Sequence, residues 1–283
     1  MIAGPTASGK SALAVEKARA LGGVIVNADA MQVYDVLRVL TARPAPEEMG
    51  DVPHLLHGSV SPAVRFSTGE WQRAAARIIA EQGERPLVFV GGTGLYFDAL
   101  LKGFAEVPEV PPEVVAEVEA ELAGLDREAR GRLIAERDPE TARLLRAPDP
   151  QRVARALAVL KATGRSLASF QAGAKRGLLD AYALERIVLN PERGVLRERI
   201  ARRFESMLDA GAVDEVRALL AMALDPGLPA MKAIGVREIA DWLDGRLSRE
   251  EMVERAVIAT RQYAKRQRTW FRGRMGDWTW IEA

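Results

Sequence analysis

The spacing of apolar residues in the first hundred positions predicts a parallel β-sheet. Short apolar runs occur at 24–29 ("VIVNAD") and 87–90 ("LVFV"). The first run follows a helical segment that ends at Gly22 and Gly23, and the second precedes a helix that begins near Leu95. Strands that alternate with helices in this way predict a parallel sheet with helices on both faces.

From residue 106 the pattern becomes helical, and the next strand-like run is at 185–190 ("ERIVLN"). We therefore predict an α/β core formed by residues 1–105 and 177–283, with an all-helical insertion domain at 106–176. The C-terminal part predicts further helices at 193–208, 213–220, 233–243 and 249 to about 272.

Composition narrows the class of protein. The 283 residues are 48% apolar, which is enough for a large core with an insertion. Cysteine is absent, which excludes disulfides, thiolate zinc sites and cysteine nucleophiles. No apolar run reaches the 18 residues of a membrane span, and the N-terminus does not resemble a signal peptide. We expect a cytoplasmic monomer that does not contact a membrane.

Charge is unevenly distributed along the chain, although the net charge is only +1. Residues 106–126 contain acidic and no basic side chains, whereas residues 255–274 contain basic and no acidic ones. Such separation is typical of a protein that meets a polyanion at one surface. A solvated helix face would give the same pattern.

The first motif is "GPTASGKS", which matches the phosphate-loop pattern G-x-x-x-x-G-K-[ST] in full. Backbone N–H groups of such a loop surround phosphate oxygens, Lys10 would reach the outer phosphates, and the Ser11 hydroxyl would bind Mg²⁺. The motif alone does not say whose phosphates are held. Only three residues precede it, so we expect a shortened strand with reduced edge pairing and an intact loop. The loop residues are Gly4, Pro5, Thr6, Ala7, Ser8, Gly9, Lys10 and Ser11.

Two polar residues follow the other predicted strands, so they should lie beside the phosphate loop at the carboxyl edge of the sheet. Asp29 would either hold Mg²⁺ through water or act as a general base, and its position alone leaves both roles open. Thr93, in the turn "VGGTGLY", offers a hydroxyl group. His54 and His57 could suggest a metal site, but without another histidine or any cysteine a structural loop is favoured.

The last predicted helix carries a basic stripe. Arg261, Lys265, Arg268 and Arg272 are spaced to lie on one side of the helix, next to an apolar stripe of Val253, Val257, Ala264 and Phe271. Basic residues beside Gln, Tyr and Trp suit contacts with RNA phosphates and bases. The stretch "DPQRVAR" supplies a second basic pair, Arg152 and Arg155. Packing of the alkyl stems on the core is the alternative.

Together these motifs resemble the tRNA dimethylallyltransferase family, also called tRNA isopentenyltransferase, of the bacterial type. The resemblance implies a phosphate-loop NTPase-like α/β core and transfer of a dimethylallyl group from dimethylallyl diphosphate to tRNA. The acceptor would be the exocyclic amine of the adenosine on the 3′ side of the anticodon, in the anticodon stem-loop. The matching stretches are "GPTASGKS", "NADAMQVYDVLRVLTARP", "VGGTGLYFDALLKG", "DPQRVARAL", "AIGVREI" and "ATRQYAKRQRTWFR".

The resemblance also implies roles for individual residues. Lys10 and Ser11 would hold the diphosphate and Mg²⁺, Asp29 would accept the amine proton, and Thr93 would lie near the reacting centre. Gln32 would read the extruded base. The implied tRNA-binding residues are Asp29, Ala30, Met31, Gln32, Gln151, Arg152, Arg155, Arg237, Arg261, Lys265 and Arg268.

Four positions depart from the family pattern. Ala30 replaces the usual Ser, Leu40 a Gly, Val115 an Arg and Val236 a Tyr, which weakens the expectation of individual tRNA contacts. Three other functions compete with the one implied: a phosphate-loop small-molecule kinase, a prenyltransferase for free adenine nucleotides, and a non-catalytic RNA-binding protein. The first would need a mobile Arg-rich lid, and no convincing lid motif is present.

Overall fold

The computed structural model describes residues 1–105, 107–145, 147–173 and 176–282 and divides into two compact units. The first consists of Met1–Leu101 and Leu178–Ala283, and the second of Lys102–Gly177. The limits predicted from the sequence, 106 and 176, lie a few residues inside the second unit.

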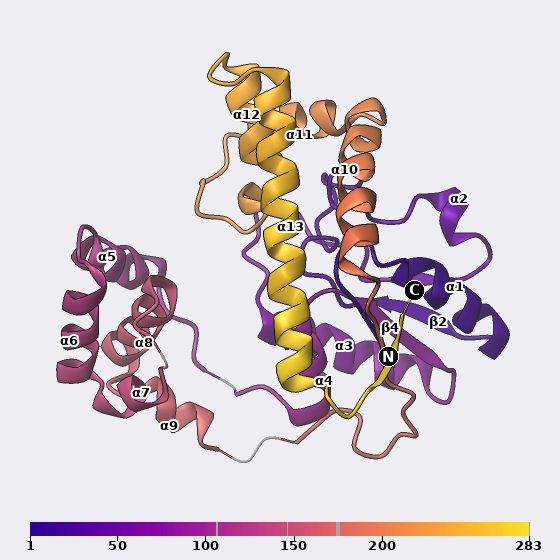
Figure 1. Ribbon diagram of the computed structural model, residues 1–283. Coiled ribbons are helices and arrows are strands. Elements are labelled where there is room, and N and C mark those ends of the chain that lie inside the picture. Colours follow the sequence, from indigo (N-terminus) through magenta and orange to yellow (C-terminus); the bar gives the residue numbers. More distant parts are fainter. Residues whose placement is uncertain (106, 146, 174–175, 283) are drawn as a thin grey trace. The chain divides into compact units, whose positions relative to one another are not determined.

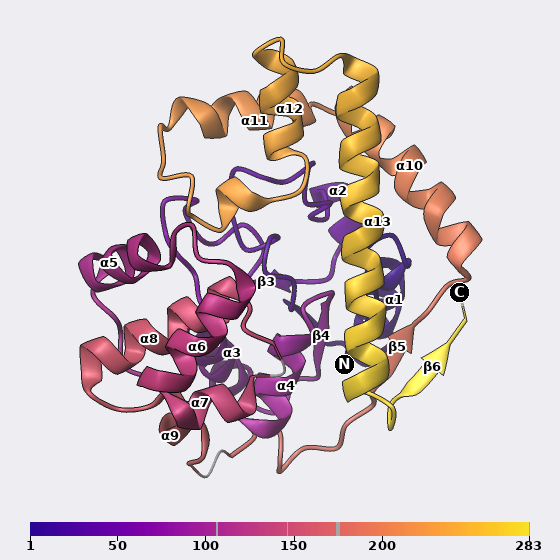
Figure 2. The ribbon, with the colours of Figure 1, turned by 60° about the vertical axis from the view of Figure 1, so that its left-hand side comes forward.

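The first unit is built on a six-stranded sheet with the strand order β3-β2-β4-β1-β5-β6. All the pairings are parallel, so the predicted fold class is confirmed. Figure 2 shows β6 beside β5 at the edge of the sheet. The strands are β1 (Ile2–Ala3), β2 (Val24–Asn27), β3 (His54–Leu55), β4 (Leu87–Gly91), β5 (Ile187–Leu189) and β6 (Thr279–Ile281).

The short first strand differs from the expectation of reduced edge pairing. β1 lies inside the sheet, where Ile2 pairs with Val90 of β4 on one side and with Ile187 of β5 on the other. Two residues suffice because both neighbours hold them in register. The phosphate loop, which follows β1, therefore lies at the middle of the carboxyl edge of the sheet.

Alternate residues of the strands face opposite layers of helices, as strand geometry requires. Ile25 and Val88 pack in one cluster with Ala14 and Ala18 of α1 (Lys10–Leu21). Side chains of α3 (Thr68–Gln82), α4 (Gly94–Lys102) and the end of α13 (Arg249–Arg274) cover the other face.

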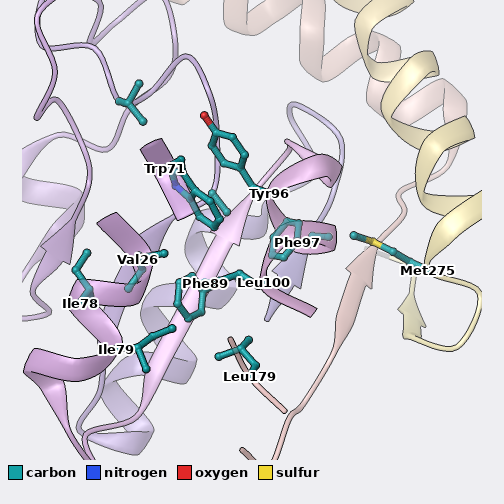
Figure 3. Close-up of a cluster of buried hydrophobic side chains, with 14 of the residues drawn as sticks. Val26, Trp71, Ile78, Ile79, Phe89, Tyr96, Phe97, Leu100, Leu179 and Met275 are labelled. Atoms are coloured by element: carbon teal, nitrogen blue, oxygen red, sulfur yellow. The ribbon is translucent and has the colours of Figure 1, made fainter. Parts of the chain in front are cut away.

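On that second face, Trp71 of α3 stacks on Tyr96 of α4 with 4.2 Å between the ring centroids (Figure 3). The same figure shows Phe89 of β4 beside them and Met275 pointing towards Phe97. The Trp71 indole also donates a hydrogen bond of 2.9 Å to the carbonyl oxygen of Asn27. This aromatic cluster therefore fixes the end of β2, where the candidate site begins.

A second core lies among the C-terminal helices α10 (Arg193–Asp209), α11 (Ala212–Ala221), α12 (Val236–Leu243) and α13. In Figure 1, α10 and α13 run side by side. Buried Val257, Ala264 and Phe271 confirm most of the predicted apolar stripe of α13. α12 begins three residues later than predicted, because Ala233 is extended after the 3-10 turn Ala230–Lys232, and Gly235, with a φ of 100°, is the N-cap of α12.

The second unit is helical, with α5 (Pro112–Leu122), α6 (Arg127–Arg137), α7 (Pro139–Leu144), α8 (Pro150–Thr163) and α9 (Leu167–Gln171). Its core includes Val118, Ile134, Val153 and Leu157. The buried Asp138 carboxylate accepts hydrogen bonds from the Ser166 hydroxyl at 2.6 Å and the Thr141 amide at 3.0 Å, which ties α7 to the start of α9.

Several elements are absent from the sequence-based assignment, namely α2 (Pro46–Met49), α3, β3 and β6. No helix within the described ranges is both long enough and apolar enough to cross a membrane.

The loop before α2 depends on one carboxylate of α11. Glu215 accepts hydrogen bonds from the amides of Arg38, Val39 and Leu40 at 3.1, 2.7 and 3.0 Å. We expect Glu215→Ala to lower the free energy of unfolding by about 2–3 kcal/mol, because the amides lose a charged acceptor. Urea unfolding measures this change.

The matched control is Asp214→Ala on the same helical turn. Asp214 is exposed and, among the described residues, forms an ion pair with Arg217 at 3.0 Å, so its loss should cost about 0.5 kcal/mol or less. Equal effects of the two substitutions would show that the Glu215 contacts do not stabilise the loop.

Candidate active site

The phosphate loop connects β1 to the first turn of α1. Ala7 and Gly9 have φ values of 63° and 87°, a conformation that turns successive backbone amides inwards. Lys10 is buried, with its ammonium 3.4 Å from the carbonyl oxygen of Pro5, whereas Ser11 is exposed. The buried Ser8 hydroxyl has no hydrogen-bond partner among the described residues. The loop thus has the shape and the donors that a phosphate requires.

Burial lowers the pKa of Lys10 to about 8, Asp29 acts in the opposite direction, and Arg203 lowers the pKa further. A buried ammonium is costly unless negative charge lies beside it. A bound phosphate oxygen would supply that charge.

Asp29 follows β2 in a turn that its neighbours hold tightly. The buried Asn27 side chain accepts a hydrogen bond from the Asp29 amide at 2.8 Å and donates one to the Asp29 carbonyl at 3.0 Å. One carboxylate oxygen of Asp29 accepts from the Met31 amide at 3.0 Å. Asn27 therefore orients the backbone at Asp29, a role that its place at the end of an apolar strand did not reveal.

The turn after β4 lies directly against this segment. The Thr93 amide donates to the carbonyl oxygen of Ala28 at 3.2 Å, and the Thr93 hydroxyl accepts from the Ala30 amide at 2.9 Å. A Cβ atom on Gly91 would lie only 2.0 Å from the Ala28 oxygen, so this position requires glycine. Asp29 and Thr93 are thus held on adjoining turns, as the sequence analysis predicts from their places at strand ends.

Arg203 of α10 is a site residue that the sequence analysis missed. Its guanidinium donates a hydrogen bond to the Thr6 hydroxyl of the phosphate loop. Burial lowers the pKa of Arg203, and the Asp29 carboxylate opposes this effect. A signal was present, because Arg203 falls on the same helix face as the buried residues Ile200 and Met207, where arginine is unusual.

Two residues of α13 complete the site and were also missed. Gln267 is buried and contacts both the phosphate loop and the turn that carries Thr93. Tyr263 interacts with Thr93 and Gln267 through its hydroxyl, and burial, with a smaller contribution from Asp29, raises its pKa. Tyr263 therefore stays neutral over the physiological pH range.

Most of the remaining predicted RNA-binding residues are exposed on helices. Gln151, Arg152 and Arg155 are exposed on α8 of the second unit, and Arg237, Arg261 and Lys265 are exposed on α12 and α13. Arg268 is half-buried, and its Nε has no partner among the described residues.

Gln32 has a contact that the sequence did not suggest. Its side-chain nitrogen donates to the carbonyl oxygens of Thr41 and Ala42 at 3.1 and 2.9 Å. If Gln32 binds a base, its side-chain oxygen would therefore accept the hydrogen bond.

His54 and His57 form a pair of rings 5.4 Å apart, with His54 in β3 rather than in a loop. Burial lowers the pKa of His57 to about 3, and His54 and Arg43 add to this effect. Within the part of the chain that the structure describes, no group of three histidine or carboxylate side chains could hold a metal ion. For a metal at the site, the Ser11 hydroxyl is one protein ligand that the phosphate loop offers, and water and phosphate oxygens could supply others.

The comparisons with known proteins agree with the geometry. A family model described as IPP transferase matches residues 32–274. The tRNA dimethylallyltransferase of Rhizobium meliloti is 51% identical over 99% of this chain and 93% of its own. The tRNA isopentenylpyrophosphate transferase structure from Bacillus halodurans is 34% identical, with a TM-score of 0.69 over 99% of this chain and 88% of that one.

A eukaryotic dimethylallyltransferase that acts on tRNA shares the fold, with a TM-score of 0.81 at 24% identity over 99% of this chain and 72% of that one. The phosphate loop, the Asp29 and Thr93 turns and the full-length similarity lead to one conclusion. The chain belongs to the IPP transferase family, together with the tRNA dimethylallyltransferases.

Proposed function

We propose that the protein transfers a dimethylallyl group from dimethylallyl diphosphate to the exocyclic amine of the adenosine on the 3′ side of the anticodon in tRNA, with release of diphosphate. The observation that carries this proposal is that two sets of functional groups lie side by side at the carboxyl edge of the sheet. The phosphate loop, with Lys10 and Arg203, suits a diphosphate leaving group. Asp29 and Thr93, on the adjoining turns, suit an amine that loses a proton.

The donor half of the site stabilises negative charge. When the C–O bond to the diphosphate breaks, charge grows on the leaving oxygens, and loop amides, the Lys10 ammonium and the Arg203 guanidinium lie where they can offset it. Mg²⁺, held by the Ser11 hydroxyl and diphosphate oxygens, would add positive charge at the same place. Ser11 is exposed on the first turn of α1, and the orphaned Ser8 hydroxyl offers a further donor to the diphosphate.

The acceptor half removes a proton. An exocyclic adenine amine is a weak nucleophile and is not accessible in a stacked base, so the adenosine would be extruded into the site. The Asp29 carboxylate would accept the amine proton as the new C–N bond forms. The Thr93 hydroxyl oxygen accepts a hydrogen bond from the Ala30 amide. The O–H of Thr93 can therefore donate to Tyr263 or to the substrate.

Contacts with the rest of the tRNA would come from exposed basic side chains. α13 presents Arg261 and Lys265, α12 presents Arg237, and α8 of the insertion presents Arg152 and Arg155. Such contacts with phosphates position the RNA without reading its sequence. The proposal extends to a cytoplasmic enzyme that acts as a monomer.

The test is incubation of the protein with Mg²⁺ and labelled dimethylallyl diphosphate in three separate reactions, with bulk tRNA, with an isolated anticodon stem-loop, and with AMP. We expect label in the RNA and none in AMP. Label in AMP alone would support the free-nucleotide prenyltransferase instead. Transfer of the γ-phosphate of labelled ATP to a small acceptor would support the kinase.

The first prediction from the proposed function concerns Asp29. Asp29→Asn keeps the shape of the side chain but removes the proton acceptor, so kcat should fall by about 10²- to 10⁴-fold. Single-turnover rates and the Kd of inorganic diphosphate measure the effect. Loss of diphosphate affinity with an intact chemical step would instead assign Asp29 to metal binding.

The second prediction concerns Arg203. Arg203→Gln should weaken binding of inorganic diphosphate by about 10- to 100-fold, because one charge-assisted contact disappears. Calorimetric titration measures the change. Arg202→Gln, at an exposed position on the same helix, is the control and should leave the affinity unchanged.

The third prediction concerns Lys265, which is exposed on α13. Lys265→Gln should weaken the binding of all tRNAs alike and reduce the slope of log K against log salt by about 1. Filter binding at several salt concentrations gives the slope. A lower melting temperature with an unchanged slope would show that the side chain packs on the core instead.

A further inference from the structure

Gln267 joins the two halves of the site from a third element. Its side-chain oxygen accepts a hydrogen bond of 2.9 Å from the Thr6 amide in the phosphate loop. Its side-chain nitrogen donates a hydrogen bond of 2.9 Å to the carbonyl oxygen of Gly92, next to Thr93. The side chain is only 5% exposed. Hence α13 holds two segments that are about 85 residues apart in the sequence.

The two partners leave the side-chain amide one orientation. Thr6 offers a backbone donor and Gly92 a backbone acceptor, so the oxygen must face Thr6 and the nitrogen must face Gly92. Glutamate could accept from Thr6 but would set a carboxylate against the Gly92 carbonyl, and methionine could make neither bond. A Cβ atom on Gly92 would lie 2.2 Å from the Gln267 nitrogen and displace it, so the hydrogen bond from Gln267 requires glycine at this position.

Each end of this bridge lies next to a residue that is proposed to act in the reaction. Thr6 also binds Arg203 through its hydroxyl, so Gln267 and Arg203 hold the same loop residue. At the other end, a Cβ atom added to Gly92 would lie 3.2 Å from a carboxylate oxygen of Asp29, so Gly92 is close to that carboxylate. The bridge therefore runs from the groups that meet the leaving diphosphate to the group that meets the amine.

We propose that Gln267 is a positioning residue that holds the phosphate loop and the Asp29–Thr93 turns in register, so that the amine attacks in line with the departing diphosphate. This inference rests on the proposed function. Because the Thr6 amide is committed to Gln267, the loop binds diphosphate through its later amides, and Gln267 itself need not touch substrate.

Loss of the Gln267 hydrogen bonds should misalign the amine and the diphosphate and so slow the reaction. A displacement of about 1 Å between reacting groups lowers a rate by about 10²-fold. If the C–O bond breaks without a nearby amine, water attacks the allylic carbon centre instead, which gives dimethylallyl alcohol or its tertiary isomer, with release of diphosphate and a proton. Misalignment should therefore raise the fraction of donor that is hydrolysed.

The experiment compares Gln267→Met and Gln267→Glu with Gln262→Met, an exposed glutamine of the same helix. Both Gln267 variants should lower kcat by about 10- to 100-fold and raise the ratio of alcohol to modified tRNA several-fold. The Kd of inorganic diphosphate should stay within about twofold, since the phosphate-binding groups remain. The control should match the unsubstituted protein in every measurement.

A second readout does not depend on turnover. In the unsubstituted protein, the Thr6 amide and the Gly91–Gly94 turn should be protected from hydrogen exchange together, and both should lose protection in Gln267→Met while α1 keeps its own. Melting temperatures of all the variants show whether the fold persists at the assay temperature.

The measurements distinguish a positioning role of Gln267 from a general structural role. An unchanged kcat and product ratio, or unchanged exchange at Thr6, would overturn the positioning role. A kcat that falls together with diphosphate affinity and melting temperature, at a constant product ratio, would also overturn it in favour of a general structural role. If the unsubstituted protein modifies no tRNA, the proposed function fails, and the exchange measurement still decides whether Gln267 couples the two segments.

Discussion

The candidate site depends on the close approach of two backbone segments, the ends of β2 and β4. The Ala28 amide donates to the Val90 carbonyl at 2.7 Å, and the Ala28 carbonyl accepts from Thr93 at 3.2 Å. This spacing exists only because Gly91 has no side chain. Neighbouring parallel strands thus end side by side, and the loops that follow must share one small region. Asp29 and Thr93 are adjacent for this reason, although 63 residues separate the Thr93 hydroxyl from its partner amide.

Charge sets the second constraint. Lys10 and Arg203 are desolvated cations at the phosphate loop, and the Asp29 carboxylate acts on the pKa of both. Burying such cations costs free energy, which the proposed diphosphate would offset on binding. In the proposed reaction, the cations at the loop would meet the leaving group, and the carboxylate at the adjoining turn would meet the amine. Tyr263, whose pKa burial raises, closes the site without adding charge.

The sequence predicted those parts of the fold and the site whose signals lie within a few neighbouring residues. The phosphate loop, Asp29 and Thr93 were found because each stands in a short motif at the end of a strand. α3 was missed even though Ser67 and Glu70 form a capping box, a local signal that could have been used. Arg203 and Gln267 act through partners 197 and 261 residues away, and such pairings cannot be read from local patterns. β3 and β6, of two and three residues, are too short for periodicity to appear.

Two of the four departures from the family pattern have a packing explanation. Leu40 and Val236 belong to the same buried cluster, and a Leu40 methyl carbon fills the space beside Gly235, 2.6 Å from where its Cβ would lie. The larger residue at 40 and the smaller one at 236 change the volume of this core in opposite directions, so each partly compensates for the other. The loop with Leu40 is also held by Glu215, and α12 with Arg237 begins directly after its N-cap Gly235. Leu40 and Val236 therefore take part in the packing of the helical layer at the start of α12, and neither takes part in the hydrogen bonds that Gln267 makes to Thr6 and Gly92.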